Sequence, residues 1–280
     1  MSGWEVFVLM VSGSVTIGFV IMWYYKILRL WPRSHNVTGR LVLGALPILS
    51  FILLLRILQS LASYDVVDNA IFIVFYLLLG FLCLAFGSMM TRMRLDLSWE
   101  DDALRLGNRA ALAAYAGAYM GMTMIYLGAN IGDGPGWWSV VFAGGLGFAA
   151  WLALAGLFNK YAYVSERITV DRSIEAGIRF GAYLLASGIL LGRASSGDWT
   201  SWWMTIVEFL AGWPVLLLTL WALQVERADA SRSHARGSRH DQTLPTALIW
   251  AVLYIAFAIV SVMLLPDIPG SPIPGWGARP

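Results

Sequence analysis

The chain has 280 residues, of which 59% are hydrophobic and 13% are charged, and its formal net charge is +2. Soluble domains have about 45–50% apolar and about 25% charged residues, so this composition excludes a soluble protein. The nearly neutral balance gives no support for nucleic acid as a partner. Cys83 is the single cysteine, which excludes an intramolecular disulfide.

Apolar segments of near 20 residues recur along the chain, and about 20 such residues cross a hydrocarbon core of about 30 Å. The sequence therefore predicts an all-α polytopic membrane bundle with eight transmembrane helices, which form a single transmembrane domain at residues 1–265. The first segment lacks the flanks of a cleaved signal and is interpreted as a retained span. The expected spans are Trp4–Tyr25, Leu41–Leu61, Asn69–Thr91, Arg105–Asn130, Gly136–Asn159, Ile174–Gly192, Ser201–Leu223 and Leu244–Leu265.

Basic residues fall on one side of this arrangement. Four lie in each of four alternate loops, which together hold 16 of the 19 lysines and arginines. Because basic loops stay in the cytoplasm, this distribution predicts internal loops and two external termini. The last basic loop contains His234 and His240, and we expect anionic lipid headgroups beside such loops.

Two segments of the chain resemble each other when aligned seventy positions apart without a gap. Each contains an apolar helix, a charged hinge, a helix start and a helix rich in small residues. This pattern predicts duplicated two-helix units at about 69–130 and 137–193. The aligned pairs are Asp101 with Asp171, Leu104 with Ile174, Gly107 with Gly177, and Arg109 with Arg179.

The charged hinges contain helix-capping chemistry. Ser98 with Asp101 follows the pattern S-x-x-D, in which a side chain accepts from free backbone N–H groups at a helix start. Thr169 or Asp171 could cap the second unit. We interpret the acidic residues of the hinge as capping groups rather than catalytic ones.

Small residues repeat at helical spacing in the second helix of each unit. Such stripes let two backbones approach closely in lipid and favour helix packing. The sequence thus predicts that these two helices form the buried centre of the bundle, with a ligand passage along the stripe as the alternative. The residues are Ala113, Gly117 and Gly121 in the first unit, and Gly177, Gly181, Gly188 and Gly192 in the second.

Residues for most cofactor and catalytic chemistry lie outside the spans. All three histidines, His35, His234 and His240, are in predicted cytoplasmic loops, so no histidine pair inside the membrane could hold a haem. No Cys/His cluster has the spacing of a metal site. We therefore expect no cofactor, no metal and no enzyme activity.

Two charged residues lie inside predicted spans, Arg56 in the second and Glu208 in the seventh. Ionisable groups in a membrane are costly and are functional candidates. Both lie at a similar depth near the outer boundary, which predicts that they face each other directly or through water. The alternative is that Arg56 reaches the headgroups alone. Weaker candidates are Asn130, Asp133, Tyr115, Tyr119 and Tyr126.

The segments Asp101–Ala113 and Asp171–Arg179 resemble the YjfL-like family of bacterial inner-membrane proteins over roughly residues 69–193. That family has the motif I/L-x-x-G-N/D-x-A-x-A at the start of the second helix of each unit. The first copy contains Gly107 and Asn108, whereas the second has Gly177 followed by Ile178. The resemblance implies a bacterial inner-membrane location, a role as a small membrane subunit, and a link to envelope stress.

Our leading hypothesis is a non-enzymatic integral membrane subunit or scaffold of a bacterial envelope complex, with other membrane or peripheral proteins as partners. The alternative is a transporter or channel with a polar path near Arg56 and Glu208. Five of the ten prolines lie in residues 266–280, which we expect to form an external Pro/Gly-rich tail.

Overall fold

A computed structural model describes residues 1–29, 36–236 and 243–264 of the protein. The expected tail at 266–280 lies outside the described residues, as do His35 and His240 and the side chain of His234. The described residues contain eight helices long and apolar enough to cross a membrane, which confirms the predicted all-α bundle.

The spans are long helices, of which the seventh is built from three consecutive pieces. They are α1 (Gly3–Arg29), α2 (Val37–Ser60), α4 (Ala70–Leu95), α5 (Arg109–Ala129), α6 (Trp137–Ala162), α8 (Ile174–Ala194), α9 (Trp202–Phe209) continued by η2 (Leu210–Gly212) and α10 (Pro214–Arg236), and α11 (Leu244–Leu264). Short helices connect some of them: α3 (Tyr64–Val67), η1 (Trp99–Arg105) and α7 (Val164–Thr169).

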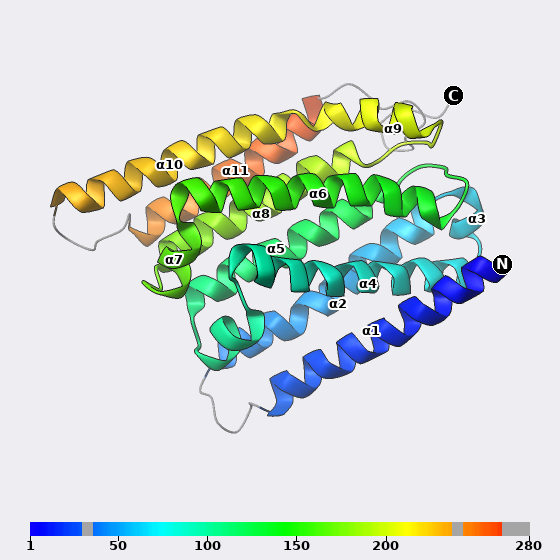
Figure 1. The fold of residues 1–280 in the computed structure, drawn as a ribbon, viewed down its shortest axis with the longest axis horizontal. Coiled ribbons are helices and arrows are strands. Elements are labelled where there is room, and N and C mark those ends of the chain that lie inside the picture. Colours follow the sequence, from blue (N-terminus) through cyan, green and yellow to red (C-terminus); the bar gives the residue numbers. More distant parts are fainter. Residues whose placement is uncertain (30–35, 237–242, 265–280) are drawn as a thin grey trace.

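The spans form four consecutive hairpins arranged in two layers (Figure 1). Hairpin 1 is α1 and α2, hairpin 2 is α4 and α5, hairpin 3 is α6 and α8, and hairpin 4 is α9–α10 and α11. The first helices of the hairpins lie side by side in one layer, and the second helices lie side by side in the other. At the centre of the second layer, α5 and α8 are the most buried of the eight spans.

Glycine contacts hold α5 against α8. A Cβ placed on Gly117 would overlap the carbonyl oxygen of Gly181, and one on Gly181 would overlap that of Ala113. Further along the same contact, Gly121 meets the backbone of Leu184 and Gly188 meets that of Gly121. The stripe predicted from the sequence therefore lies where two backbones touch, and this contact is the most extensive between any two described helices.

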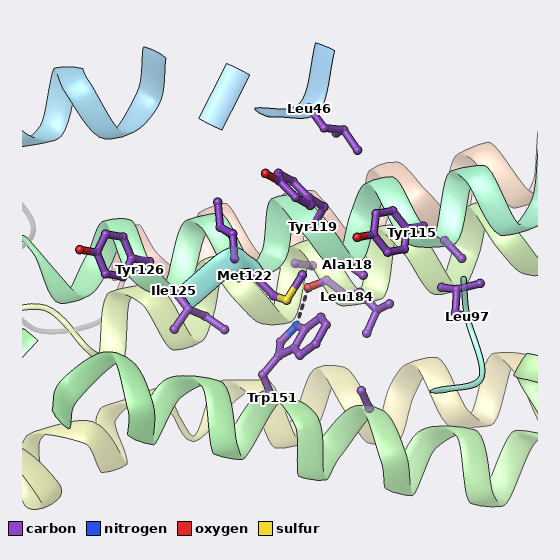
Figure 2. Close-up of a cluster of buried hydrophobic side chains, with 14 of the residues drawn as sticks. Leu46, Leu97, Tyr115, Ala118, Tyr119, Met122, Ile125, Tyr126, Trp151 and Leu184 are labelled. Carbon is purple, nitrogen blue, oxygen red and sulfur yellow. Dashed lines mark hydrogen bonds between the residues drawn. The ribbon is translucent and has the colours of Figure 1, made fainter. Parts of the chain in front are cut away.

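Side chains from the other layer extend this centre (Figure 2). The indole Nε1 of Trp151 on α6 donates to the carbonyl oxygen of Leu184 at 2.9 Å. On α5, Tyr115 and Tyr119 are fully buried and pack near Trp23 of α1. Both layers are thus attached to the α5–α8 contact.

The hinge of hairpin 2 is a seven-residue π-helix, η1. Ser98 Oγ accepts from the backbone N of Asp101 at 3.1 Å, as the sequence predicts. The reciprocal bond differs, because the backbone N of Ser98 donates to the carboxylate of Asp102 at 2.9 Å. Trp99 stacks on Trp23 of α1 with ring centroids 4.0 Å apart. Ser98 and Asp102 therefore cap the start of η1, and Trp99 packs η1 against α1.

The predicted alignment of the two units, seventy positions apart, does not match the positions of their helix caps. Asn108 caps α5 and Ser173, rather than Thr169 or Asp171, caps α8. The residue before each cap has positive φ, 62° at Gly107 and 55° at Arg172. The caps are thus sixty-five residues apart rather than seventy, and the starts of α4 and α6 are sixty-seven apart. The connection between the long helices is two residues shorter in hairpin 3 (163–173) than in hairpin 2 (96–108), which accounts for the change from sixty-seven to sixty-five.

This register corrects all four expected pairs, and two of them show the difference most clearly. Gly107 precedes α5, whereas Gly177 lies inside α8 and packs on the backbone of Ala110. Similarly, Arg109 is the exposed first residue of α5, whereas Arg179 is buried within α8.

Replacing Gly117 or Gly181 with Leu should destabilise the fold by about 3 kcal/mol, since overpacking that cannot be relieved by a side chain must move the backbone. Thermal unfolding in mild detergent would measure this loss. Gly156→Leu on α6 is the matched control, because a Cβ at Gly156 meets open space. Equal stability of all three variants would contradict the importance of the α5–α8 contact.

Candidate functional site

Four charged residues gather at the end of the bundle where α7 lies. Arg167 comes from α7, Arg179 from α8, and Glu226 and Asp229 from α10. Glu226 and Asp229 are three residues apart on one helix, so their side chains leave the same face. Arg179 is five residues after the start of α8, which places it roughly 8 Å along the helix at 1.5 Å per residue.

Each arginine contacts both carboxylates. Arg167 Nη1 lies 2.7 Å from Glu226 Oε2, and its Nη2 lies 2.6 Å from Asp229 Oδ2. Arg179 Nε lies 2.5 Å from Glu226 Oε1, and its Nη2 lies 2.8 Å from Asp229 Oδ2. We call these four residues the charge cluster.

The charge cluster is buried, with side-chain exposure of 0% for Arg179, 2% for Glu226, 3% for Asp229 and 14% for Arg167. Two positive and two negative groups compensate each other, as buried ions must. Arg179 Nη1 and the hydroxyl of Tyr254 on α11 are buried without a hydrogen-bond partner among the described residues. The cluster thus joins α7 and α8 of hairpin 3 to hairpin 4.

Sequence reasoning missed this cluster because it placed Glu226 and Asp229 in a loop. The apolar segment ends at Leu223, but the helix continues to Arg236. It also counted Arg179 among the basic residues of a cytoplasmic loop. The E-x-x-D spacing on α10 is the signal that could have indicated two carboxylates on one helix face.

Arg56 and Glu208 do not form an ion pair within the part of the chain that the structure describes. Arg56 is exposed on α2, whereas Glu208 is half-buried on α9 and lines a hollow at the other end of the bundle from the charge cluster. Similar depth brought these two residues together in the prediction, but depth does not determine which way a side chain leaves its helix. The direct pair predicted from the sequence is therefore corrected.

Two loops meet at that opposite end. The loop after α5 and the loop after α8 each contain Gly followed by Asp, with φ of 110° at Gly132 and 127° at Gly197. The backbone N of Asp133 donates to Asp198 Oδ1 at 2.6 Å, and the backbone N of Trp199 donates to the Asp133 carbonyl at 2.7 Å. These bonds join hairpins 2 and 3 at the end of the bundle opposite the charge cluster.

The weaker candidates have structural partners or positions in the core. Asn130 donates from Nδ2 to the Tyr126 carbonyl at 2.7 Å, and the Tyr126 hydroxyl donates to the Tyr76 carbonyl at 2.8 Å. The hydroxyl of Tyr115 bonds Ser88 Oγ at 2.9 Å. Tyr119 is buried in the aromatic group around Trp23.

The remaining motif residues lie at the surface or in a helix cap. Asp101 forms ion pairs with Arg92 and Arg105, at 3.1 and 3.0 Å; both arginines are well exposed, and Asp101 is partly exposed. Asp171 is exposed, whereas Asn108 is buried and donates from Nδ2 to the Ile168 carbonyl at 2.7 Å. Asn108 therefore connects the two hinges.

Within residues 1–29, 36–236 and 243–264, no group of three or more His, Cys, Asp or Glu residues is arranged to hold a metal ion. The chemistry of the charge cluster is ion pairing between neighbouring elements.

Comparison with protein families gives one match. A family model described as "Domain of Unknown Function (DUF350)" matches residues 57–194, just under half of the chain. Searches of curated proteins and of solved structures found no significant match. The matched segment contains hairpins 2 and 3 and coincides with the region that resembles the YjfL-like family, whose name remains a prediction.

The match supports an uncharacterised family of membrane proteins and places Arg167 and Arg179 inside the family segment. Their partners Glu226 and Asp229 lie beyond it. The charge cluster is therefore a connection between the family segment and the fourth hairpin.

Arg179→Met should lower the free energy of unfolding by about 3–5 kcal/mol, because it leaves two buried carboxylates with only one arginine, Arg167, to compensate them. A fourfold variant, Arg167→Met with Arg179→Met, Glu226→Leu and Asp229→Leu, should lose less stability than Arg179→Met alone. Unfolding in detergent measures both.

The control is Arg105→Met, which breaks an exposed pair and should cost less than about 1 kcal/mol. If the fourfold variant were the least stable, the cluster would contribute more than mutual compensation of its charges.

Proposed function

We propose that the protein is a non-enzymatic integral membrane subunit, or scaffold, of a bacterial envelope complex. The observation that carries this proposal is the α5–α8 contact, in which glycine backbones touch along the centre of the bundle. Helices in such contact cannot slide or separate without losing packing, because lipid gives no hydrophobic drive to restore it. This construction suits a rigid platform that presents its ends to partners.

Exposed basic residues at the end where α7 lies offer a surface for such partners. Arg94 and Arg109 are exposed beside the hinge of hairpin 2, and Lys160, Arg172 and Arg227 are exposed near that of hairpin 3. Anionic lipid headgroups attract basic side chains next to a membrane. A partner protein with an acidic surface would use the same residues, and a role in envelope stress belongs to this proposal.

A transporter or channel requires a polar path, for which Arg56 and Glu208 were the candidates. Because Arg56 is exposed on α2 and makes no ion pair with Glu208, this geometry does not favour the alternative.

The proposal includes a bacterial inner-membrane location in which the hinges of hairpins 2 and 3 face the cytoplasm. In a Cys83→Ser background, Val170→Cys should resist an impermeant thiol reagent in intact cells, whereas Tyr64→Cys should react. Both positions are well exposed, with 70% and 75% exposure, so access depends on the side of the membrane. Labelling of Val170→Cys but not of Tyr64→Cys would show that the protein has the opposite orientation in the membrane.

A complex subunit should purify with a partner in mild detergent, at a constant ratio that quantitative mass spectrometry can measure. Arg94→Glu with Arg109→Glu should lower this ratio, because reversed charge repels an acidic surface. Asp65→Lys with Asp68→Lys, exposed at the opposite end, is the control and should leave it unchanged. Absence of any partner at a constant ratio would contradict the subunit role.

A further inference from the structure

An apolar groove lies between α4, α5 and α6. It has a volume of about 390 Å³, within the roughly 300–1,000 Å³ typical of ligand sites. Its lining includes Cys83 and Phe86 of α4 and Met122, Ile125 and Tyr126 of α5. Figure 2 shows these three α5 side chains along one helix. Cys83 lies near the middle of α4, so the groove is at mid-membrane depth.

Two adjacent glycines of α6 contribute to this groove. Gly144 and Gly145 both line it, and a Cβ on Gly145 would meet no other atom within 4 Å. A larger side chain at Gly145 would therefore enter the groove rather than disturb a neighbouring helix. The hydroxyl of Tyr126 is already bonded to the Tyr76 carbonyl, so the groove presents hydrocarbon and sulfur to an occupant.

A smaller hollow of about 40 Å³ adjoins the groove at the outer end of the bundle. Val140 lines both the groove and the smaller hollow. The side chain of Asn130, which lines the smaller hollow, donates a hydrogen bond to the backbone carbonyl of Tyr126, which lines the groove. A buried water molecule needs a cavity of roughly 10–15 Å³, so the smaller hollow has room for a few waters or one small headgroup.

The smaller hollow is acidic. Its lining includes Asp133, Asp198 and Glu208, and no Lys or Arg of the described residues lines either hollow. The buried Arg193 precedes the lining residue Ala194 and offsets part of this charge, but three carboxylates against one guanidinium still leave this end acidic. Glu208 forms no ion pair with a described residue. The charge of this end therefore complements a cation, whereas the groove complements a hydrocarbon chain.

We propose that the two adjoining hollows bind one amphiphile, with its apolar chain in the groove between α4, α5 and α6 and a small protonated amine beside Asp198 and Glu208. Charge complementarity selects a cationic head, and the size of the outer hollow selects a primary amine over a phosphate-containing headgroup. This ligand class goes beyond the structural role proposed above and does not depend on it.

Photo-crosslinking tests this binding in the full chain reconstituted in phosphatidylcholine vesicles. The probes are an alkylammonium, an alkyl alcohol and an alkyl sulfate, each with the same chain and the same diazirine in it. Mass spectrometry would compare labelling of the groove with labelling of the exposed apolar face of α11. The alkylammonium should label the groove roughly fivefold more than the sulfate, as expected for a half-buried ion pair.

Two sets of variants test binding of the ligand's apolar chain and of its charged head separately. Gly145→Leu should abolish groove labelling by the alkylammonium, whereas Gly156→Leu, also on α6 but outside the groove, should leave it unchanged. Asp198→Asn with Glu208→Gln should remove the preference for the ammonium probe. Equal labelling of the groove and of α11, or equal labelling of the groove by all three probes, would overturn the proposal.

Discussion

The rest of the structure depends on the close approach of α5 and α8. In lipid, no hydrophobic force drives two helices together, so association requires packing, and glycine makes backbone packing possible. Gly117 against Gly181 and Gly121 against Leu184 bring the two axes together at the centre of one layer. The neighbouring second helices then extend this layer on either side, and the first helices cover it (Figure 1).

The charge cluster is built on this closely packed centre, because Arg179 belongs to α8. Arg179 leaves α8 on a face that also packs against hairpin 4, and its guanidinium is fully buried. Such a group is tolerated only if its carboxylate partners are held in place, since a displaced partner leaves an uncompensated charge. The stability of the fourth hairpin, beyond the segment that matches the family, is thus linked to a residue inside that segment.

Sequence reasoning predicts periodic features well and relative orientation poorly. Hydropathy and the alternation of basic loops identify all eight spans, because membrane thickness requires a minimum apolar length. The same reasoning misplaces the repeat register, because the caps of α5 and α8 are sixty-five rather than seventy residues apart, which puts Gly177 and Arg179 inside α8. It also pairs Arg56 with Glu208 from depth alone. At 3.6 residues per turn, the direction in which side chains leave a helix changes by about 100° from one residue to the next. The depth of a residue in the membrane therefore does not determine which neighbour its side chain faces.

The two ends of the bundle treat their carboxylates differently, and this asymmetry indicates where each end can act. At the end near α7, Glu226 and Asp229 are each matched by arginines, so their charges are compensated within the protein. At the opposite end, Asp198 and Glu208 line a hollow without a basic residue among its described lining. Because its charges compensate each other within the protein, the first end has a structural role and holds hairpins 3 and 4 together. The second has charge left to attract a cation, and an apolar groove beside it determines what kind of cation would stay.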